Sequence, residues 1–107
     1  MNFKCEQAEN IRTIRIYGDL NKFELQGLKN SLLDLKSLSE VAVDLTEVDF
    51  AGSDFLNLFL DIKHHYPSDY GKIVFINPNE LIQELFEMTQ LNRLYRVRKE
   101  QAEAVSA

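Results

Sequence analysis

The sequence predicts an α/β domain built on a mixed, mostly parallel β-sheet of about five strands. Two segments with alternating apolar and polar residues, 2–7 and 11–17, are typical of strands joined by a hairpin. The continuous apolar run 73–76 is typical of a parallel strand that is covered on both faces. Between the predicted strands, apolar residues recur at helical spacing. Strands that alternate with helices form mostly parallel sheets, so the expected order is β-β-α-β-α-β-α-β.

The first half of the chain is expected to hold the hairpin and the first helix. Ala8-Glu9-Asn10 is a plausible hairpin turn, and the segment Gly18-Asp19-Leu20-Asn21 then breaks the strand pattern. Asn21 followed by Glu24 matches an asparagine version of the capping box, which predicts a helix start. The second strand is expected to be half exposed, so the helices should pack mainly on one face of the sheet. The leucines expected on the first helix are Leu25, Leu28, Leu32, Leu33 and Leu35.

The centre of the chain is predicted to be a strand–turn–helix joint. Residues 40–45 read as a buried strand, and the turn places Gly52-Ser53-Asp54 where the second helix begins. Free backbone N–H groups and the positive end of the helix dipole stabilise negative charge at such a joint. The helix is expected to end near Tyr66-Pro67. Its predicted apolar face is Phe55, Leu56, Phe59, Leu60 and Ile62.

The last third is predicted to add a helix and an edge strand. Asn77-Pro78-Asn79-Glu80 predicts a helix start with a cap and with proline in the first turn. Residues 94–97 are expected to form the edge strand. Residues 1–99 form one predicted domain, and residues 100–107 a tail that is a frayed helix or disordered. The third helix is expected to pack through Leu81, Ile82, Leu85, Phe86 and Met88.

Composition and charge favour a soluble protein of the cytoplasm. The 107 residues suit one domain, and 45% are hydrophobic and 27% charged. A net charge of −5 argues against non-specific binding to nucleic acid and to anionic membranes. No apolar run approaches the roughly 20 residues that span a bilayer, and the first ten residues have no apolar signal core. The basic run 93–99 is expected to be a solvated edge, with an acidic partner as the alternative.

The sequence gives little support for catalysis, and we expect neither an enzyme nor a cofactor. It has no glycine-rich phosphate loop and no Cys/His cluster with metal-ligand spacing. His64 lies about three helical turns from Ser53 and Asp54, too far for a catalytic triad. His64 and His65 point about 100° apart on a helix, so they are expected to be solvated. Cys5 is expected to be a half-buried, inert thiol.

Several segments, taken in order, resemble one known family. They are Gly18-Asp19-Leu20-Asn21, the run from Val43 to Phe50 (VDLTEVDF), Asn77-Pro78, and the run from Leu85 to Val97 (LFEMTQLNRLYRV). Together they resemble the STAS domain family, which includes bacterial anti-sigma-factor antagonists and the cytoplasmic domains of sulphate transporters. The resemblance covers roughly residues 10–98 and implies a STAS-like fold.

The chain departs from the family pattern at the family's regulatory centre. An ungapped alignment places the family's Asp-Ser-Ser-Gly on Gly52-Ser53-Asp54-Phe55. In the family the second serine is the usual acceptor of phosphate from a partner kinase, and Asp54 occupies that position here. We hypothesise that switching at this position has been lost and that the surface is fixed in one charge state. Phosphorylation of Ser53 would contradict the hypothesis.

The resemblance implies a non-catalytic protein-interaction domain, like an anti-sigma-factor antagonist, in signal transduction. The expected partner is an anti-sigma factor or a serine (switch) kinase, with a phosphatase opposing it, and any ATP and Mg²⁺ would belong to the kinase. The chain itself is expected to be a monomer or a weak homodimer. The residues expected to contact the partner are Asp19, Asn21, Thr46, Gly52, Ser53, Asp54, Phe55 and Asn57.

Two other functions stay open at this point. The chain could be a subunit of a larger signalling or lipid-transport assembly, which the departure at the phosphorylation site favours somewhat. It could also be a small-ligand-binding α/β domain or a minor enzyme, for which the sequence offers no pocket signature.

Overall fold

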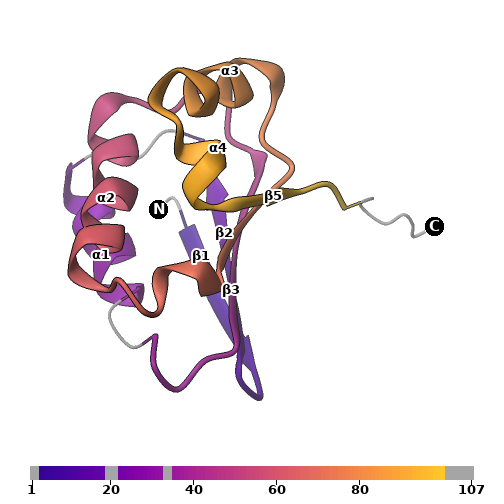
Figure 1. Ribbon diagram of the computed structural model, residues 1–107. Helices are drawn as coiled ribbons and strands as arrows, with labels where there is room; N and C mark the ends of the chain where they lie inside the picture. Colours follow the sequence, from indigo (N-terminus) through magenta and orange to yellow (C-terminus); the bar gives the residue numbers. More distant parts are fainter. Residues whose placement is uncertain (1–2, 19–21, 33–34, 101–107) are drawn as a thin grey trace.

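The computed structural model describes residues 3–18, 22–32 and 35–100 of the chain. One five-stranded sheet, in the spatial order β1-β2-β3-β4-β5, runs through it (Figure 1). β1 and β2 are antiparallel, and the pairs β2–β3, β3–β4 and β4–β5 are parallel. The predicted mixed, mostly parallel sheet is therefore confirmed. The strands are β1 Phe3–Ala8, β2 Ile11–Tyr17, β3 Glu40–Glu47, β4 Ile73–Ile76 and β5 Arg96–Arg98.

The helices cover one face of this sheet. From β2 onward each crossover moves the chain by one strand in the same direction. Because such crossovers are right-handed, successive helices fall on the same face. Figure 1 shows α1 and α2 side by side on that face. The helices are α1 Lys22–Ser31, α2 Ser53–His65, α3 Glu80–Thr89 and α4 Leu91–Leu94, with a short 3-10 helix at Tyr70–Lys72.

The main core fills the space between the helices and the sheet. Its aromatic centre is Phe59 of α2, whose ring centroid lies 4.8 Å from that of Phe75 in β4 and 5.8 Å from that of Tyr95. The Tyr95 hydroxyl donates a hydrogen bond to the backbone oxygen of Phe59. The segment that leads into β5 is therefore fastened to α2 by a buried hydrogen bond as well as by packing.

The opposite face of the sheet carries ion pairs over a small apolar cluster. Ala42, Val74 and Ile76 form that cluster. The guanidinium of Arg98 lies 3.2 Å from the carboxylate of Glu40, so β5 is linked to β3 across β4. Val74 and Ile76, the two residues of β4 on this face, are therefore buried although no helix of the described residues covers them.

Several predicted apolar faces were wrong in detail. α1 ends at Ser31, so the buried Leu32 and Leu35 lie beyond the helix rather than on it. On α2, Leu60 is 37% exposed, and Leu58 takes a core position instead. On α3, Leu81 and Met88 are 45% and 78% exposed, because only one narrow side of this outer helix faces the core.

The start of α3 and the approach to β5 also differ from the prediction. Asn79 is the N-cap and Pro78 precedes it, so the proline does not lie in the first turn. Asn77 adopts a left-handed conformation with φ 57°. The edge strand begins at Arg96, because Gln90, with φ 63°, breaks α3 and starts the short α4. Cys5 is exposed rather than half buried, since β1 is an edge strand.

Several predictions concern residues outside the described ranges, among them the one that places Leu33 on the first helix. The capping box depends on Asn21, and the tail prediction concerns residues 100–107, of which only Glu100 is described. Among the helices in the described part of the chain, none has the length and apolar character needed to cross a membrane.

Candidate functional site

The candidate site lies where the parallel strands end. The loop after β3, residues 48–52, leads directly into α2 at this edge of the sheet. The backbone N–H of Gly18 donates to the oxygen of Glu47 at 3.0 Å, and that of Val48 donates to the oxygen of Leu45 at 3.0 Å. Backbone hydrogen bonds thus fix the end of β2 beside the end of β3.

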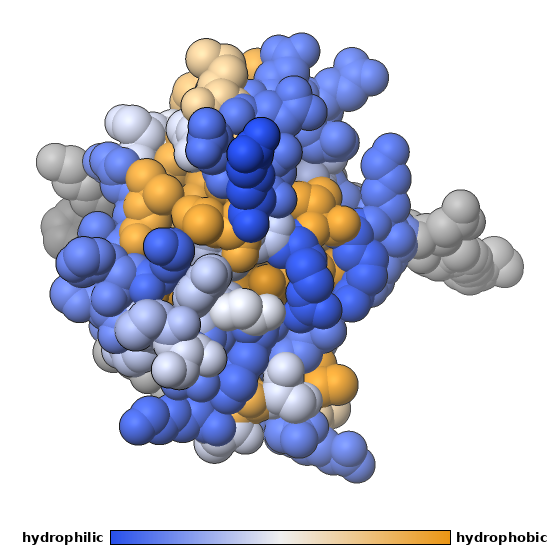
Figure 2. All heavy atoms as spheres, viewed as in Figure 1, coloured by the Kyte–Doolittle hydropathy of each residue, from blue (hydrophilic) through white to orange (hydrophobic). Residues whose placement is uncertain are grey.

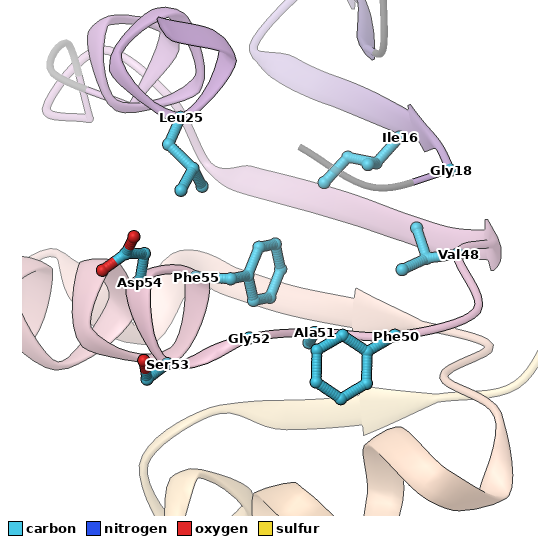
Figure 3. A pocket seen from close by; sticks show the side chains of 10 residues that line it. All are labelled: Ile16, Gly18, Leu25, Val48, Phe50, Ala51, Gly52, Ser53, Asp54 and Phe55. Atoms are coloured by element: carbon cyan, nitrogen blue, oxygen red, sulfur yellow. The ribbon is translucent and has the colours of Figure 1, made fainter. Parts of the chain in front are cut away.

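A hollow of about 380 Å³, which we call the edge pocket, opens beside this loop (Figure 3). The ring of Phe55 points into it from α2, while Leu25 faces it from α1 (Figure 3). Phe50 is 53% exposed, which is unusual for a large aromatic side chain. The edge pocket is lined by Ile16, Gly18, Leu25, Val48, Phe50, Ala51, Gly52, Ser53, Asp54 and Phe55.

The start of α2 is electropositive and lacks a side-chain cap. Gly52 is the N-cap and makes no side-chain hydrogen bond, and the first helical bond runs from the Leu56 N–H to the Gly52 oxygen at 3.1 Å. The preceding N–H groups have no acceptor within the helix, so negative charge is favoured here. Asp54 lies in this first turn and points toward α1, whereas Ser53 points away from it (Figure 3).

Gly52 is not required by the backbone. Its φ of −86° and ψ of 178° are open to any residue. A Cβ added there would lie 3.6 Å from the ring of Phe50, an ordinary van der Waals contact. Neither the backbone conformation nor a clash at the Cβ therefore requires glycine at this position.

Asn79 ties the loop after β3 to α3. Its Oδ1 accepts a hydrogen bond from the N–H of Ile82 at 2.8 Å, which caps α3. Its Nδ2 donates to the backbone oxygens of Val48 at 3.3 Å and Asp49 at 3.1 Å. One side chain therefore caps a helix and holds the loop that carries Phe50.

A second polar network holds the end of β3. The Thr46 hydroxyl donates to Oδ1 of Asp44 at 2.5 Å and accepts from Nδ2 of Asn77 at 3.0 Å. Asn77 also exchanges hydrogen bonds with the backbone of Glu100, at 2.9 and 2.8 Å. The ends of β3 and β4 and the segment after β5 are thus linked side by side.

The structure brings most of the predicted contact residues together. Gly52, Ser53, Asp54 and Phe55 all line the edge pocket, although Phe55 is only 6% exposed and can contribute only to its floor. Asn57 lines a neighbouring hollow together with Asp54. Thr46 is exposed but does not line the pocket, and it takes part in the polar network instead. Asp19 and Asn21 lie outside the described residues.

Two residues of the site were not singled out from the sequence. Phe50 belongs neither to the strand pattern before it nor to the helix pattern after it. This position between two elements is the feature of the sequence that could have indicated an exposed aromatic residue. Asn79 could be recognised only as part of a helix start, because its contacts to Val48 and Asp49 span about thirty residues of sequence.

The described residues contain no group of three or more His, Cys, Asp or Glu side chains placed to hold a metal ion. The rings of His64 and His65 lie 6.0 Å apart, nearly perpendicular, at the end of α2. They are remote from the start of that helix, where the edge pocket lies.

The fold is that of a small α/β domain with a hollow, the edge pocket, at the carboxyl ends of its parallel strands. The sequence matches the model of the STAS domain over residues 2–104. The chain belongs to the STAS domain family. No curated protein matches the sequence.

Solved structures support the same fold. A STAS-domain anti-sigma-factor antagonist protein from Planctomyces limnophilus shares 17% identity, with a TM-score of 0.75 over 97% of this chain and 95% of that one. An anti-sigma-factor antagonist from Mycobacterium paratuberculosis shares 14%, with a TM-score of 0.74 over 95% and 88%. The phosphorylated form of the Bacillus cell-fate determinant SpoIIAA shares 15%, with a TM-score of 0.71 over 95% and 96%. At these identities the likeness establishes a shared fold.

Proposed function

We propose that this chain is a non-catalytic protein-interaction domain that acts like an anti-sigma-factor antagonist and binds an anti-sigma factor or a switch kinase. The observation that carries the proposal is the coincidence of two features at one place. The family's regulatory motif aligns with residues 52–55, and the edge pocket with its exposed aromatic residue opens at those residues. The names of its structural neighbours support the same class of partner.

The proposed docking surface combines an apolar anchor with a fixed charge. Phe50 offers an exposed aromatic side chain, and aromatic residues including phenylalanine are enriched at protein interfaces. Asp54 adds a carboxylate at the helix start, with Gly52 and Ser53 beside it. Thr46 and Asn57 flank this centre, and the turn with Asp19 and Asn21 belongs to the surface by the resemblance alone.

Asp54 makes the charge state of this surface permanent. A phosphoserine carries about −1.5 to −2 charges at pH 7, whereas an aspartate carries one, so the mimicry of a phosphorylated state is partial. The N–H groups at the start of α2 stabilise the carboxylate without any modification. Incubation with the partner kinase and ATP, followed by mass spectrometry, should find no phosphate at residue 53 or 54. Phosphate on Ser53 would refute the fixed charge state while leaving the docking proposal in place.

In this proposal the chain works in the cytoplasm and contributes no chemistry of its own. Any ATP and Mg²⁺ belong to the kinase partner, and a phosphatase has no substrate at Asp54. The chain contributes recognition, and its charge state decides which partner it can retain.

Affinity capture with matched baits tests the docking proposal. The baits are the wild-type chain, Asp54→Arg and Glu84→Arg, where Glu84 is an exposed acid of α3 away from the edge pocket. We expect wild type and Glu84→Arg to retain an anti-sigma factor or switch kinase from the native cytosol, and Asp54→Arg to lose it. Equal capture by all three baits, or no partner of this class, would count against the proposal.

A second candidate is a subunit of a larger signalling or lipid-transport assembly. The exposed Leu81 and Met88 on α3 favour it, because apolar side chains on an outer helix suit contact with another subunit. Size-exclusion chromatography of the chain with the products of neighbouring genes separates the candidates. Co-elution that is lost with Met88→Asp but kept with Asp54→Arg would favour the assembly.

A further inference from the structure

Two more hollows continue the edge pocket along the seam between α1 and α2. The first, of about 290 Å³, shares Leu25 and Asp54 with the edge pocket. The second, of about 340 Å³, shares Lys29 and Asp61 with the first and reaches His65. Because each hollow shares lining residues with the next, they form one track, which we call the helix groove. It runs from Asp54 along α2 to His65.

The helix groove has the length and floor of a site for a short helix. Eleven residues of α2 separate its ends, which at 1.5 Å per residue is about 16 Å, or three turns of a bound helix. Part of its floor is apolar, because the buried side chains of Leu58 and Ile62 of α2 and Leu32 after α1 line it, while Gln26 and Asn57 add polar groups. A groove of this kind takes an amphipathic helix through apolar side chains three and four residues apart.

The charged side chains along the edges of the helix groove indicate which charges a bound partner would carry. Asp54 and Asp61 lie seven residues apart on α2, so they point to the same side, about two turns from each other. In the described part of the chain, neither carboxylate has an ion-pair partner within 4.0 Å. Lys29 on the α1 side and His65 at the far end are the basic side chains of the groove. The α2 rim is therefore acidic and the α1 rim is not.

We propose that the helix groove receives an amphipathic helix of the protein partner, with two basic residues two turns apart. These residues pair with Asp54 and Asp61, and the apolar side of the helix lies on the floor. Lys29 repels a basic residue on the α1 rim and so fixes which side of the bound helix carries the charges. The proposal deepens the proposed function and rests on it for the nature of the partner.

Selection from a peptide library on the purified chain tests this inference. The probe is a displayed library of helix-favouring 14-residue peptides, selected on the immobilised wild-type chain. We expect the enriched peptides to carry Arg or Lys at positions i and i+7, with apolar residues between them. Amide shifts on binding should concentrate in residues 25–32 and 54–65.

Matched variants locate the contact. Asp61→Asn and Asp54→Asn should each weaken a selected peptide by about twofold to fivefold, more at low salt than at high salt. Glu84→Gln, which makes the same charge change on α3, should leave its affinity unchanged. The proposal would be overturned if the selected peptides lacked the basic pair, or if Asp61→Asn left their affinity unchanged. It would also be overturned if the selection gave no binder at all.

Other outcomes remain distinguishable. If a second copy of the chain occupied the groove, sedimentation would show a dimer that Asp61→Lys abolishes, and the helix proposal would fail. The selection uses no anti-sigma factor or kinase, so it can fail while the capture experiment with Asp54→Arg succeeds. Failure of the capture experiment alone would instead contradict the proposed class of partner.

Discussion

At the scale of single residues, two aspartates of α2 have different physical settings. Asp54 lies in the first turn, where the unpaired N–H groups and the helix dipole favour a negative charge. Asp61 lies two turns further along, beyond the reach of that effect. The same residue type therefore stabilises the helix at one position and serves only surface contacts at the other.

Asp54→Asn should lower the free energy of unfolding by about 0.3–1 kcal/mol at low salt, because a favourable charge–dipole interaction is lost. Asp61→Asn is the matched control, and we expect it to change stability less. Urea denaturation at low and high ionic strength measures both. An Asp54→Asn effect that does not shrink with added salt would contradict the dipole interpretation.

Phe50→Ala should leave the fold nearly as stable as wild type, within about 0.5 kcal/mol, since half of the side chain is already exposed. Binding of the partner should nevertheless weaken by at least tenfold, which corresponds to about 1.4 kcal/mol. Met88→Ala is the control, because Met88 is 78% exposed on α3. Calorimetric titration checks both variants. Equal losses in the two would remove Phe50 from the proposed surface.

At the scale of elements, Asn79 joins the start of α3 to the loop that carries Phe50. Its Oδ1 acts on the helix, and its Nδ2 acts on the loop. The two roles can be separated, because aspartate is as good an N-cap as asparagine but has no N–H to donate.

Asn79→Asp should keep α3 capped while it releases the loop. We expect faster amide hydrogen exchange in residues 49–54, with exchange at the start of α3 little changed. Asn79→Ala should affect both and lower the free energy of unfolding by about 0.5–2 kcal/mol, the usual cost of losing a cap. Unchanged loop exchange in Asn79→Asp would show that the backbone bonds of the loop suffice to hold it.

The elements themselves were largely predictable, and their ends were not. The hairpin and the buried run of β4 follow from local periodicity, which the sequence displays directly. The end of α1 and the break before α4 depend on how the chain turns to reach the next strand. Leu32 and Leu35 keep helical spacing and are buried, yet they lie outside α1. The helical spacing of these apolar residues therefore predicts that they are buried, but it does not predict where the helix ends.

At the scale of the whole molecule, Tyr95 fastens the last crossover to the core. It is 2% exposed and donates its hydroxyl proton to the backbone of Phe59. Burial raises the pKa of Tyr95, and the neighbouring Tyr70 raises it further. A pKa that is raised in the folded state contributes stability below the unfolded pKa of about 10, and that stability is lost as the pH rises above it.

The wild-type chain should therefore lose stability above about pH 10, with Tyr95 contributing up to about 1.4 kcal/mol per pH unit. Tyr95→Phe should show a shallower alkaline slope and, at neutral pH, a loss of about 1 kcal/mol from the missing hydrogen bond. Tyr66→Phe is the control for removal of one phenol. Denaturation between pH 7 and 11 gives the comparison, and an unchanged slope in Tyr95→Phe would contradict the role of burial.

The location of the candidate site could be predicted from the sequence, but its extent could not. The joint at residues 52–54 is contiguous in sequence, so its helix-start chemistry could be recognised there. The edge pocket also needs Ile16 and Leu25, and the helix groove needs Lys29 and Asp61 from two helices. Only the packing of α1 against α2 brings these side chains together. The relative position of the two helices cannot be read from local sequence patterns.

The most direct test of the docking surface is a calorimetric titration of the captured partner into three versions of the chain. These are the wild type, Asp54→Arg and the α3 control Glu84→Arg. We expect tight, equal binding by wild type and Glu84→Arg, and binding weaker by about tenfold or more by Asp54→Arg. Equal affinity for Asp54→Arg and wild type would contradict it, because the partner would then bind elsewhere on the molecule.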